Sequence, residues 1–97
     1  LDTFVFEKGG TPADIFKRDY KELQASDLII AEVSETSHGV GMEIGLSYGL
    51  GLKRLLLTEK GRKVTKLAQG MPDTTIIEYD DTDDLKERLA NALAKAQ

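Results

Sequence analysis

The feature that most constrains the fold is an apolar run at residues 28–33, which only Glu32 interrupts. The apolar residues of this run follow one another directly instead of alternating with polar ones. Such a pattern is typical of a strand that is buried on both faces of a parallel sheet. Because a parallel sheet needs helices on both faces, we expect a strand at residues 27–33 within an α/β fold.

The rest of the chain alternates between strand-like and helix-like segments. Further strands are expected at residues 3–6, 54–58 and 74–79. Helices are expected at residues 11–25 and 40–52, within 59–70, and after the aspartate-rich residues 80–84. This order predicts one domain over residues 1–97 with a doubly wound parallel sheet. Its ligand site should lie beyond the carboxyl ends of the strands.

Composition narrows the possible partners. The net charge of −4 gives no electrostatic footprint for nucleic acid, and the scattered basic residues do not predict binding to a membrane surface. No apolar run approaches the roughly 20 residues of a membrane span, and no signal-peptide pattern is present. The absence of cysteine, together with a single histidine, argues against a metal site. We therefore expect a cytoplasmic protein that binds a small molecule.

One charged residue, Glu43, stands in an otherwise apolar and glycine-rich stretch at residues 39–52. A lone carboxylate is costly to bury unless it is paired or protonated. Glu43 can be interpreted either as a helix N-terminal acid stabilised by free amides or as a functional carboxylate.

A second carboxylate, Asp19, also occupies an unexpected position. Helical spacing places it on or beside the apolar stripe that includes Ile15 and Leu23. It is either an exposed acid paired with Arg18 or Lys21, or the partner of a second carboxylate at a cleft. Two carboxylates at a cleft are the usual equipment for cleaving a glycosidic bond.

The glycines around Glu43 suggest two further features. Ser37, Gly39 and Gly41 flank a helix N-terminus, where free amides can hold a phosphate. Their spacing is neither the dinucleotide fingerprint nor a nucleotide triphosphate loop, so no cofactor is expected. Glycines at 41, 45 and 49 form a stripe, which predicts close approach by the sheet or by a helix of a second copy.

Asp19, the run at residues 25–34 and the run at residues 37–45 together resemble the nucleoside 2-deoxyribosyltransferase family. Within that family the pattern is most similar to the 2′-deoxynucleoside 5′-phosphate N-hydrolases. The resemblance implies a Rossmann-like, flavodoxin-like doubly wound sheet and an N-glycosidase that forms homodimers. It also implies that Glu43 is the nucleophile, which forms a covalent 2-deoxyribosyl 5-phosphate intermediate, and that Asp19 is the general acid/base at the nucleobase.

The resemblance further implies a 5′-phosphate seat made by Ser37 and the amides near Gly39 and Gly41. The segment 61–66 resembles a family loop that reaches the phosphate of the neighbouring subunit. In that loop Thr65 stands where the hydrolases have serine, and it keeps the hydroxyl.

Alternative activities remain open at this point. The serine and glycines that precede Glu43 favour a phosphorylated substrate, hence hydrolysis over transfer between unphosphorylated nucleosides. A ribonucleotide N-glycosidase of the CMP type and a non-catalytic nucleotide-binding domain are the other candidates. Family members begin with a strand and a Gly-rich loop, and the strand expected at residues 3–6 corresponds to their second strand. We therefore expect a chain that lacks the family's first β-α unit.

Overall fold

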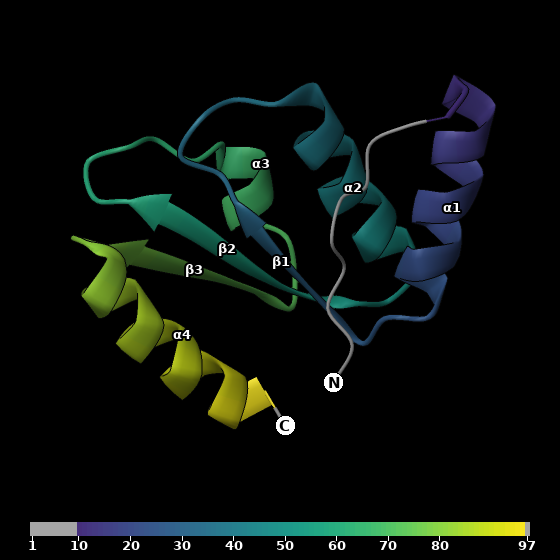
Figure 1. Cartoon of the computed structure of the whole chain (residues 1–97). Coiled ribbons are helices and arrows are strands. Elements are labelled where there is room, and N and C mark those ends of the chain that lie inside the picture. Colours follow the sequence, from purple (N-terminus) through teal and green to yellow (C-terminus); the bar gives the residue numbers. More distant parts are fainter. Residues whose placement is uncertain (1–9, 97) are drawn as a thin grey trace.

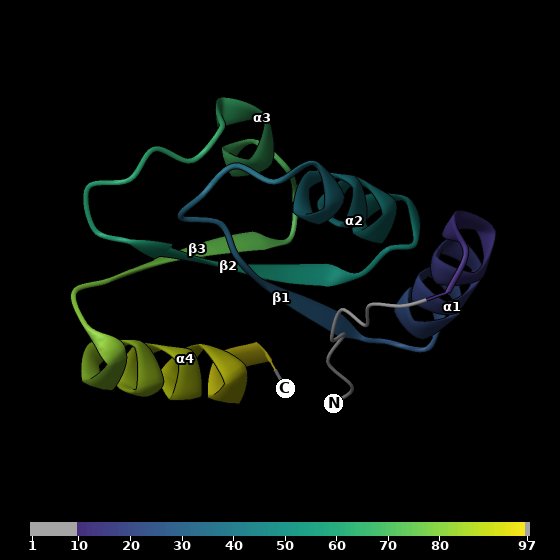
Figure 2. The same ribbon diagram turned by 45° about the horizontal axis from the view of Figure 1, so that its top comes forward.

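The computed structural model describes residues 10–96, and three parallel strands form one sheet there. The strands, in the spatial order β1-β2-β3, are β1 (Leu28–Glu32), β2 (Lys53–Glu59) and β3 (Thr74–Tyr79). Figure 2 shows α2 (His38–Gly49) and α3 (Lys66–Gln69) over one face of the sheet and α4 (Thr82–Ala96) over the other. The expected doubly wound α/β architecture is confirmed, while the strand expected at residues 3–6 lies outside the described residues.

Helix α1 (Pro12–Gln24) begins where the sequence predicts. The Thr11 hydroxyl accepts a hydrogen bond from the Asp14 amide at 3.2 Å, and the Asp14 carboxylate accepts one from the Thr11 amide at 3.4 Å. This reciprocal capping satisfies two amides that have no partner within the helix. The helix lies beside α2, away from α3 (Figure 1).

Helix α2 differs from the expected boundaries at both ends. It begins at His38 rather than Val40, because Ser37 caps it and its hydroxyl accepts from the Val40 amide at 3.4 Å. It ends at Gly49, because Gly51 takes a left-handed conformation with φ of 76° that leads the chain out of the helix. Glu43 is therefore the sixth residue of the helix rather than the fourth, beyond its first turn.

The main core lies between the sheet and the α2–α3 layer. Its buried residues come from three helices, two strands and the α2–β2 turn: Leu23, Ile29, Ile44, Leu52, Leu56 and Ala68. Their burial holds α1 and α2 in place beside the sheet and sets where their polar side chains lie.

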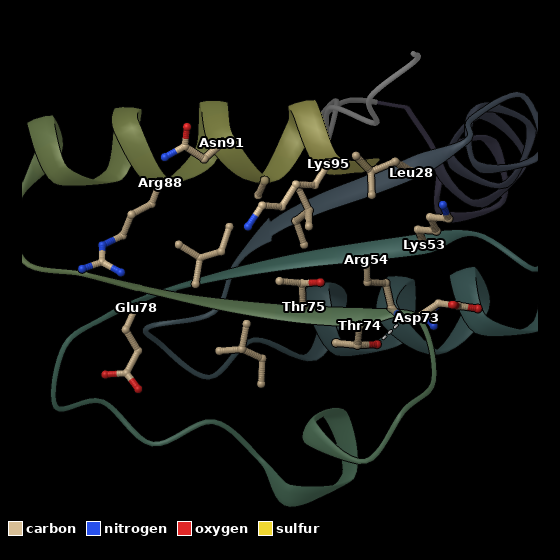
Figure 3. Close-up of a pocket in the computed structure, with 14 residues that line it drawn as sticks. Leu28, Lys53, Arg54, Asp73, Thr74, Thr75, Glu78, Arg88, Asn91 and Lys95 are labelled. Atoms are coloured by element: carbon tan, nitrogen blue, oxygen red, sulfur yellow. Dashed lines mark hydrogen bonds between the residues drawn. The ribbon is translucent and has the colours of Figure 1, made fainter. Parts of the chain in front are cut away.

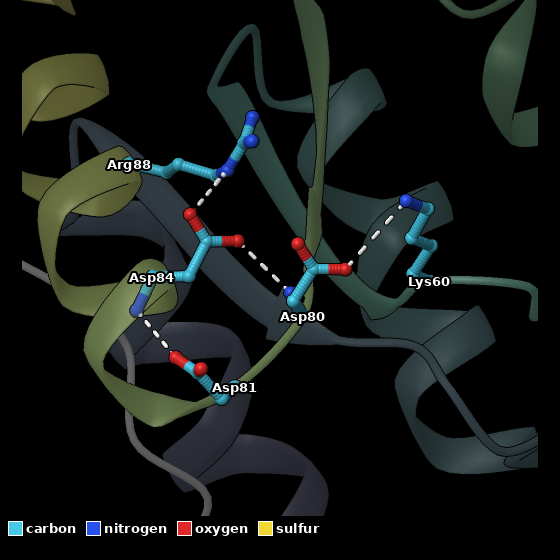
Figure 4. A network of polar contacts seen from close by, with 5 residues as sticks. All are labelled: Lys60, Asp80, Asp81, Asp84 and Arg88. Carbon is cyan, nitrogen blue, oxygen red and sulfur yellow. Dashed lines mark hydrogen bonds and ion pairs between the residues drawn. The ribbon is translucent and has the colours of Figure 1, made fainter.

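The aspartates before α4 act as the sequence predicts, near the helix N-terminus (Figure 4). The Asp81 carboxylate accepts from the Asp84 amide at 2.8 Å, and the Asp84 carboxylate accepts from the Asp80 amide at 2.9 Å. Asp84 also accepts from Arg88 at 2.8 Å, and Lys60 lies 3.8 Å from Asp80. The capping bonds determine where α4 begins, whereas exposed ion pairs of this kind contribute little to stability.

Candidate functional site

Glu43 has a buried carboxylate oxygen, Oε1, that the described residues leave without a hydrogen bond. Burial, and secondly repulsion by Asp19, raise the pKa of Glu43 to about 7. Because Glu43 lies beyond the first turn of α2, the free amides at the helix start do not stabilise it, and the reading as a simple helix N-terminal acid fails.

Asp19 lies on α1 and is half-buried, as its helical spacing predicts. Leu23, one turn further along the helix, is fully buried and anchors this face of α1 in the core. The packing brings Asp19 close enough to Glu43 for the two carboxylates to repel one another. Sequence reasoning therefore identified two carboxylates from separate helices that the fold places together.

Three of the four residues expected to hold a phosphate line one small cavity. Ser37, Gly41 and Thr65 border a space of about 210 Å³ between the start of α2 and the loop before α3. Lys63 lines the same cavity and brings a positive charge to it, while Gly39 is not among its lining residues. Neither Glu43 nor Asp19 is among the residues that line this cavity.

The amides at the start of α2 are only partly available to a ligand. The Gly41 amide donates to the Ser37 carbonyl at 3.1 Å, and the Val40 amide donates to the Ser37 hydroxyl. The amides that remain at the helix start are those of His38 and Gly39, which the helix itself cannot satisfy. Because Gly41 has no side chain, an anion can approach its Cα atom closely. Its N–H group is already hydrogen-bonded and cannot donate to that anion.

Thr65 caps the short helix α3, where its hydroxyl oxygen accepts from the Leu67 amide at 3.3 Å. Its hydroxyl hydrogen remains available to donate to a ligand. Ser37 and Thr65 of the same chain border one cavity, so a second subunit is not needed to bring these two hydroxyls together.

The glycine stripe of α2 does not pack on the sheet. A Cβ atom added to Gly41, Gly45 or Gly49 would meet no described atom within 4 Å. The expectation of helix-on-sheet contact through this stripe is therefore wrong for residues 10–96. The sheet instead contacts the opposite side of α2, where Ile44 and Ser47 are buried.

Sequence reasoning missed two polar groups that matter structurally. Arg54 is 1% exposed and donates hydrogen bonds to Thr74 and Ser47, but an arginine at the start of a strand gives no sign of burial. Glu32 accepts a hydrogen bond from the Tyr79 hydroxyl at the carboxyl end of the sheet. The sequence signal for Glu32 was its position as the one charged residue in the apolar run at residues 28–33.

Another cavity, of about 570 Å³, lies between β3 and α4 on the opposite face of the sheet. Figure 3 shows Arg88, Asn91 and Lys95 of α4 on one side of it and Thr74, Thr75 and Glu78 of β3 on the other. None of the predicted site residues lines it. Among residues 10–96, no three His, Cys, Asp or Glu side chains are grouped as metal ligands.

Comparison with known proteins links this geometry to one family. A family model described as nucleoside 2-deoxyribosyltransferase matches residues 4–94. Two relatives carry the name "Putative 2'-deoxynucleoside 5'-phosphate N-hydrolase 1". The one from Thermofilum pendens is 35% identical over 96 residues, which is 95% of this chain and 67% of the relative. The one from Syntrophotalea carbinolica is 34% identical over 95 residues, 94% of this chain and 67% of the relative.

Similarities over a smaller share of this chain extend to other proteins named as N-hydrolases or N-glycosidases. The 5-hydroxymethyl-dUMP N-hydrolase of Rattus norvegicus is 35% identical over 75 residues, 75% of this chain and 46% of the relative. Among solved structures, the CMP N-glycosidase BcmB of Clostridium botulinum superposes with a TM-score of 0.74 and 25% identity. The match covers 81% of this chain and 74% of that one.

Proposed function

Because this chain belongs to the nucleoside 2-deoxyribosyltransferase family, we propose that it hydrolyses the N-glycosidic bond of 2′-deoxynucleoside 5′-monophosphates. The products are the free base and 2-deoxyribose 5-phosphate. The observation that carries this proposal is the carboxylate pair, in which Glu43 is buried, has an unpartnered oxygen and lies close to Asp19. The names of the relatives support an enzyme that acts on N-glycosyl compounds.

In the proposed mechanism the two carboxylates have different tasks. An Oε atom of ionised Glu43 attacks C1′ while the C1′–N bond breaks, and Asp19 donates a proton to the departing base. A water molecule then attacks C1′ and gives a proton to Asp19, and the bond to Glu43 breaks. Glu43 suits the attack because no described donor hydrogen-bonds to its Oε1 atom and weakens it as a nucleophile.

The 5′-phosphate is proposed to lie at the start of α2, where the described contacts leave donors available. The hydroxyls of Ser37 and Thr65 and the amide of Gly39 are the donors, and Gly41 allows close approach. Lys63 adds a positive charge at the same cavity. Because a phosphate dianion is attracted by such a set and a bare 5′-hydroxyl is not, a monophosphate should be preferred over its nucleoside.

The test is release of free base from dGMP, dCMP, their ribose counterparts and the unphosphorylated nucleosides, followed by chromatography. We expect release from the 2′-deoxynucleoside monophosphates and little from the nucleosides. A second base added to the reaction separates hydrolysis from transfer, since a transferase forms a new nucleoside or nucleotide with it. Binding of a monophosphate without release of base from any substrate would leave only the non-catalytic nucleotide-binding domain.

A ribonucleotide N-glycosidase is the second candidate, and the fold similarity to a CMP N-glycosidase favours it. The two activities differ in whether the 2′-hydroxyl is accepted. Comparing dCMP with CMP at equal concentration decides between them: faster release of cytosine from CMP would favour the second candidate.

We further propose that the protein forms a homodimer through the exposed side of α2. Gly45 and Gly49 stand there in open space, although each costs about 1 kcal/mol of helix stability relative to alanine. Met42 and Tyr48 beside them are 68% and 54% exposed. A closely packed helix from a second copy would make use of both the glycines and these side chains. Sedimentation should show a dimer that Gly45→Trp dissociates, while Ala90→Trp on the exposed side of α4 leaves it intact.

A cytoplasmic location also belongs to the proposal, because free nucleotides are its substrates. None of the described helices has the length and apolar character to cross a membrane. Fractionation of cells that express the protein should recover it with the soluble nucleotide-metabolising enzymes, whereas recovery in another compartment would contradict this part of the proposal.

A further inference from the structure

The carboxyl ends of all three strands are joined by side-chain hydrogen bonds, and Glu32 is the centre of this arrangement. Glu32 is the last residue of β1, and its Oε2 atom accepts a hydrogen bond from the Tyr79 hydroxyl at the end of β3. Strands β1 and β3 are not neighbours, because β2 lies between them. The Glu32 side chain therefore reaches across the end of β2.

The same carboxylate also holds the loop that leaves β1. Its Oε1 atom accepts from the Ser34 amide at 2.5 Å, and the Ser34 hydroxyl accepts from the Glu59 amide at the end of β2 at 2.8 Å. The Val33 amide donates to the Leu57 carbonyl at 2.7 Å. The first two residues after β1 are thus held to all three strands. We call Glu32, Ser34 and Tyr79 the strand-end clamp.

The clamp lies immediately before Ser37 in the chain. Only residues 35 and 36 separate Ser34 from Ser37, and both line the cavity that Ser37 and Thr65 border. With its start held and its end anchored by the cap of α2, this short loop has little freedom to change its path. The clamp is therefore placed to set the distance between Ser37 and Thr65.

Electrostatics agree with this geometry. Burial alone would raise the pKa of Glu32, but the hydrogen bonds from Tyr79 and Ser34 and the nearby charge of Arg62 lower it. Glu32 thus stays ionised near neutral pH, and hydrogen bonds to an ionised acceptor are the stronger kind.

We propose that Glu32 and Tyr79 are positioning residues for the 5′-phosphate seat, which they hold in place through the loop that ends at Ser37. This inference rests on the proposed function. It predicts that loss of the clamp weakens recognition of the phosphate and leaves Asp19 and Glu43 undisturbed, because neither lines this cavity and neither bonds to the clamp residues.

The test compares KM and kcat for a 2′-deoxynucleoside monophosphate and for its unphosphorylated nucleoside. Tyr79→Phe removes one hydroxyl and keeps the ring, so the fold should be retained. It should raise KM for the monophosphate about tenfold, the loss of one hydrogen bond to a charged group. The value of kcat should change less than about threefold, and both constants for the nucleoside should stay within the same limit.

A second set of variants separates clamping from general destabilisation. Glu32→Ala removes both bonds, and combining it with Tyr79→Phe should raise KM no further, because the two residues act through one contact. Glu32→Gln keeps one acceptor oxygen, so its KM should lie between those of the wild type and Glu32→Ala. Glu59→Gln, an exposed acid at the end of β2, is the matched control and should behave as the wild type does.

The outcomes are distinguishable. An unchanged KM for the monophosphate in Tyr79→Phe, multiplicative effects in the double variant, or equal losses on phosphorylated and unphosphorylated substrates would each overturn the clamp proposal. The wild-type protein tests the proposed function separately. If it released no base and calorimetry detected no binding of the monophosphate, both proposals would fail together. If it released base normally, failure of the variants would count against the clamp alone.

Discussion

Arg54 of β2 and Glu43 of α2 both have buried charged atoms, and their surroundings are opposite. Arg54 lies at the amino end of β2 and donates to four oxygens: those of Thr74 and Ser47 and the carbonyls of Leu52 and Pro72. Glu43 lies one helical turn before Ser47 on α2, and its Oε1 atom has no hydrogen-bond partner among the described residues.

The difference in hydrogen bonding indicates different roles for Arg54 and Glu43. Burial lowers the pKa of Arg54, and electrostatic interactions with Asp73 and Tyr48 offset this only in part. The guanidinium also lies 5.6 Å from the centre of the Tyr48 ring. A buried charge that donates a hydrogen bond from each of its three nitrogens joins elements together, here α2, β2 and the start of β3. A buried charge without partners is costly to the fold, and such groups occur where chemistry needs them. This contrast fits a structural role for Arg54 and agrees with the proposed catalytic role of Glu43.

The largest expected effect is a loss of activity when Glu43 is substituted. Glu43→Gln keeps the size of the side chain and removes the nucleophile, so base release should fall by at least about a thousandfold. Glu22→Gln on the exposed side of α1 is the matched control and should retain full turnover. The measurement is the initial rate of base release, with circular dichroism to confirm folding. Retained activity in Glu43→Gln would remove Glu43 from the mechanism.

Substitution of Arg54 should lower the stability of the fold and leave the activity of the folded protein unchanged. Arg54→Met leaves Ser47 and the carbonyls of Leu52 and Pro72 without their donor, so the free energy of unfolding should fall by about 3 kcal/mol. Urea denaturation measures this loss, and Lys53→Met at the exposed neighbouring position should change it by less than about 0.5 kcal/mol. Turnover per folded molecule should be unchanged. A fall in kcat for folded Arg54→Met as large as that for Glu43→Gln would show that Arg54 also contributes to the reaction.

The pH dependence of turnover sharpens the comparison further. With its pKa raised to about 7, Glu43 is ionised above that pH and protonated below it. If ionised Glu43 attacks C1′, kcat/KM should fall about tenfold per pH unit below pH 7. An unphosphorylated 2′-deoxynucleoside serves as the control substrate, because a phosphate group itself titrates near pH 6. A rate that instead falls above pH 7 would assign Glu43 the role of proton donor.

The smallest expected effect concerns stability and pH. Because its pKa is raised above 4.5 in the folded chain, Glu43 binds its proton more tightly there than in the unfolded chain. Its contribution to stability is thus fully present below pH 4.5 and is lost as the pH rises through about 7. After discounting for solvent screening, the loss is about 1 kcal/mol. Urea denaturation should therefore find Glu43→Gln more stable than the wild type at pH 8, by about that amount. An equal or lower stability would mean that ionised Glu43 costs the fold nothing.

Much of the fold could be predicted from local patterns. The apolar run at residues 28–33 indicated the parallel sheet, and the strand at residues 74–79 was located to the residue. Thr11 and Pro12 correctly marked the start of α1. The start of α2 was placed two residues late, because the capping bond of Ser37 outweighs the weak helix preference of the residues that follow it.

The sequence by itself determined the alternation of elements and the two carboxylates that do not suit their surroundings, since both follow from spacing along the chain. The tertiary structure alone decided how these carboxylates relate to other groups. It brought Asp19 to Glu43, gave Arg54 its four acceptors, and joined Glu32 to Tyr79, residues that lie 47 positions apart. Such contacts depend on how helices and strands pack, and no local pattern encodes them. The same packing gave each nitrogen of the Arg54 guanidinium an acceptor and left one oxygen of Glu43 without a partner among the described residues.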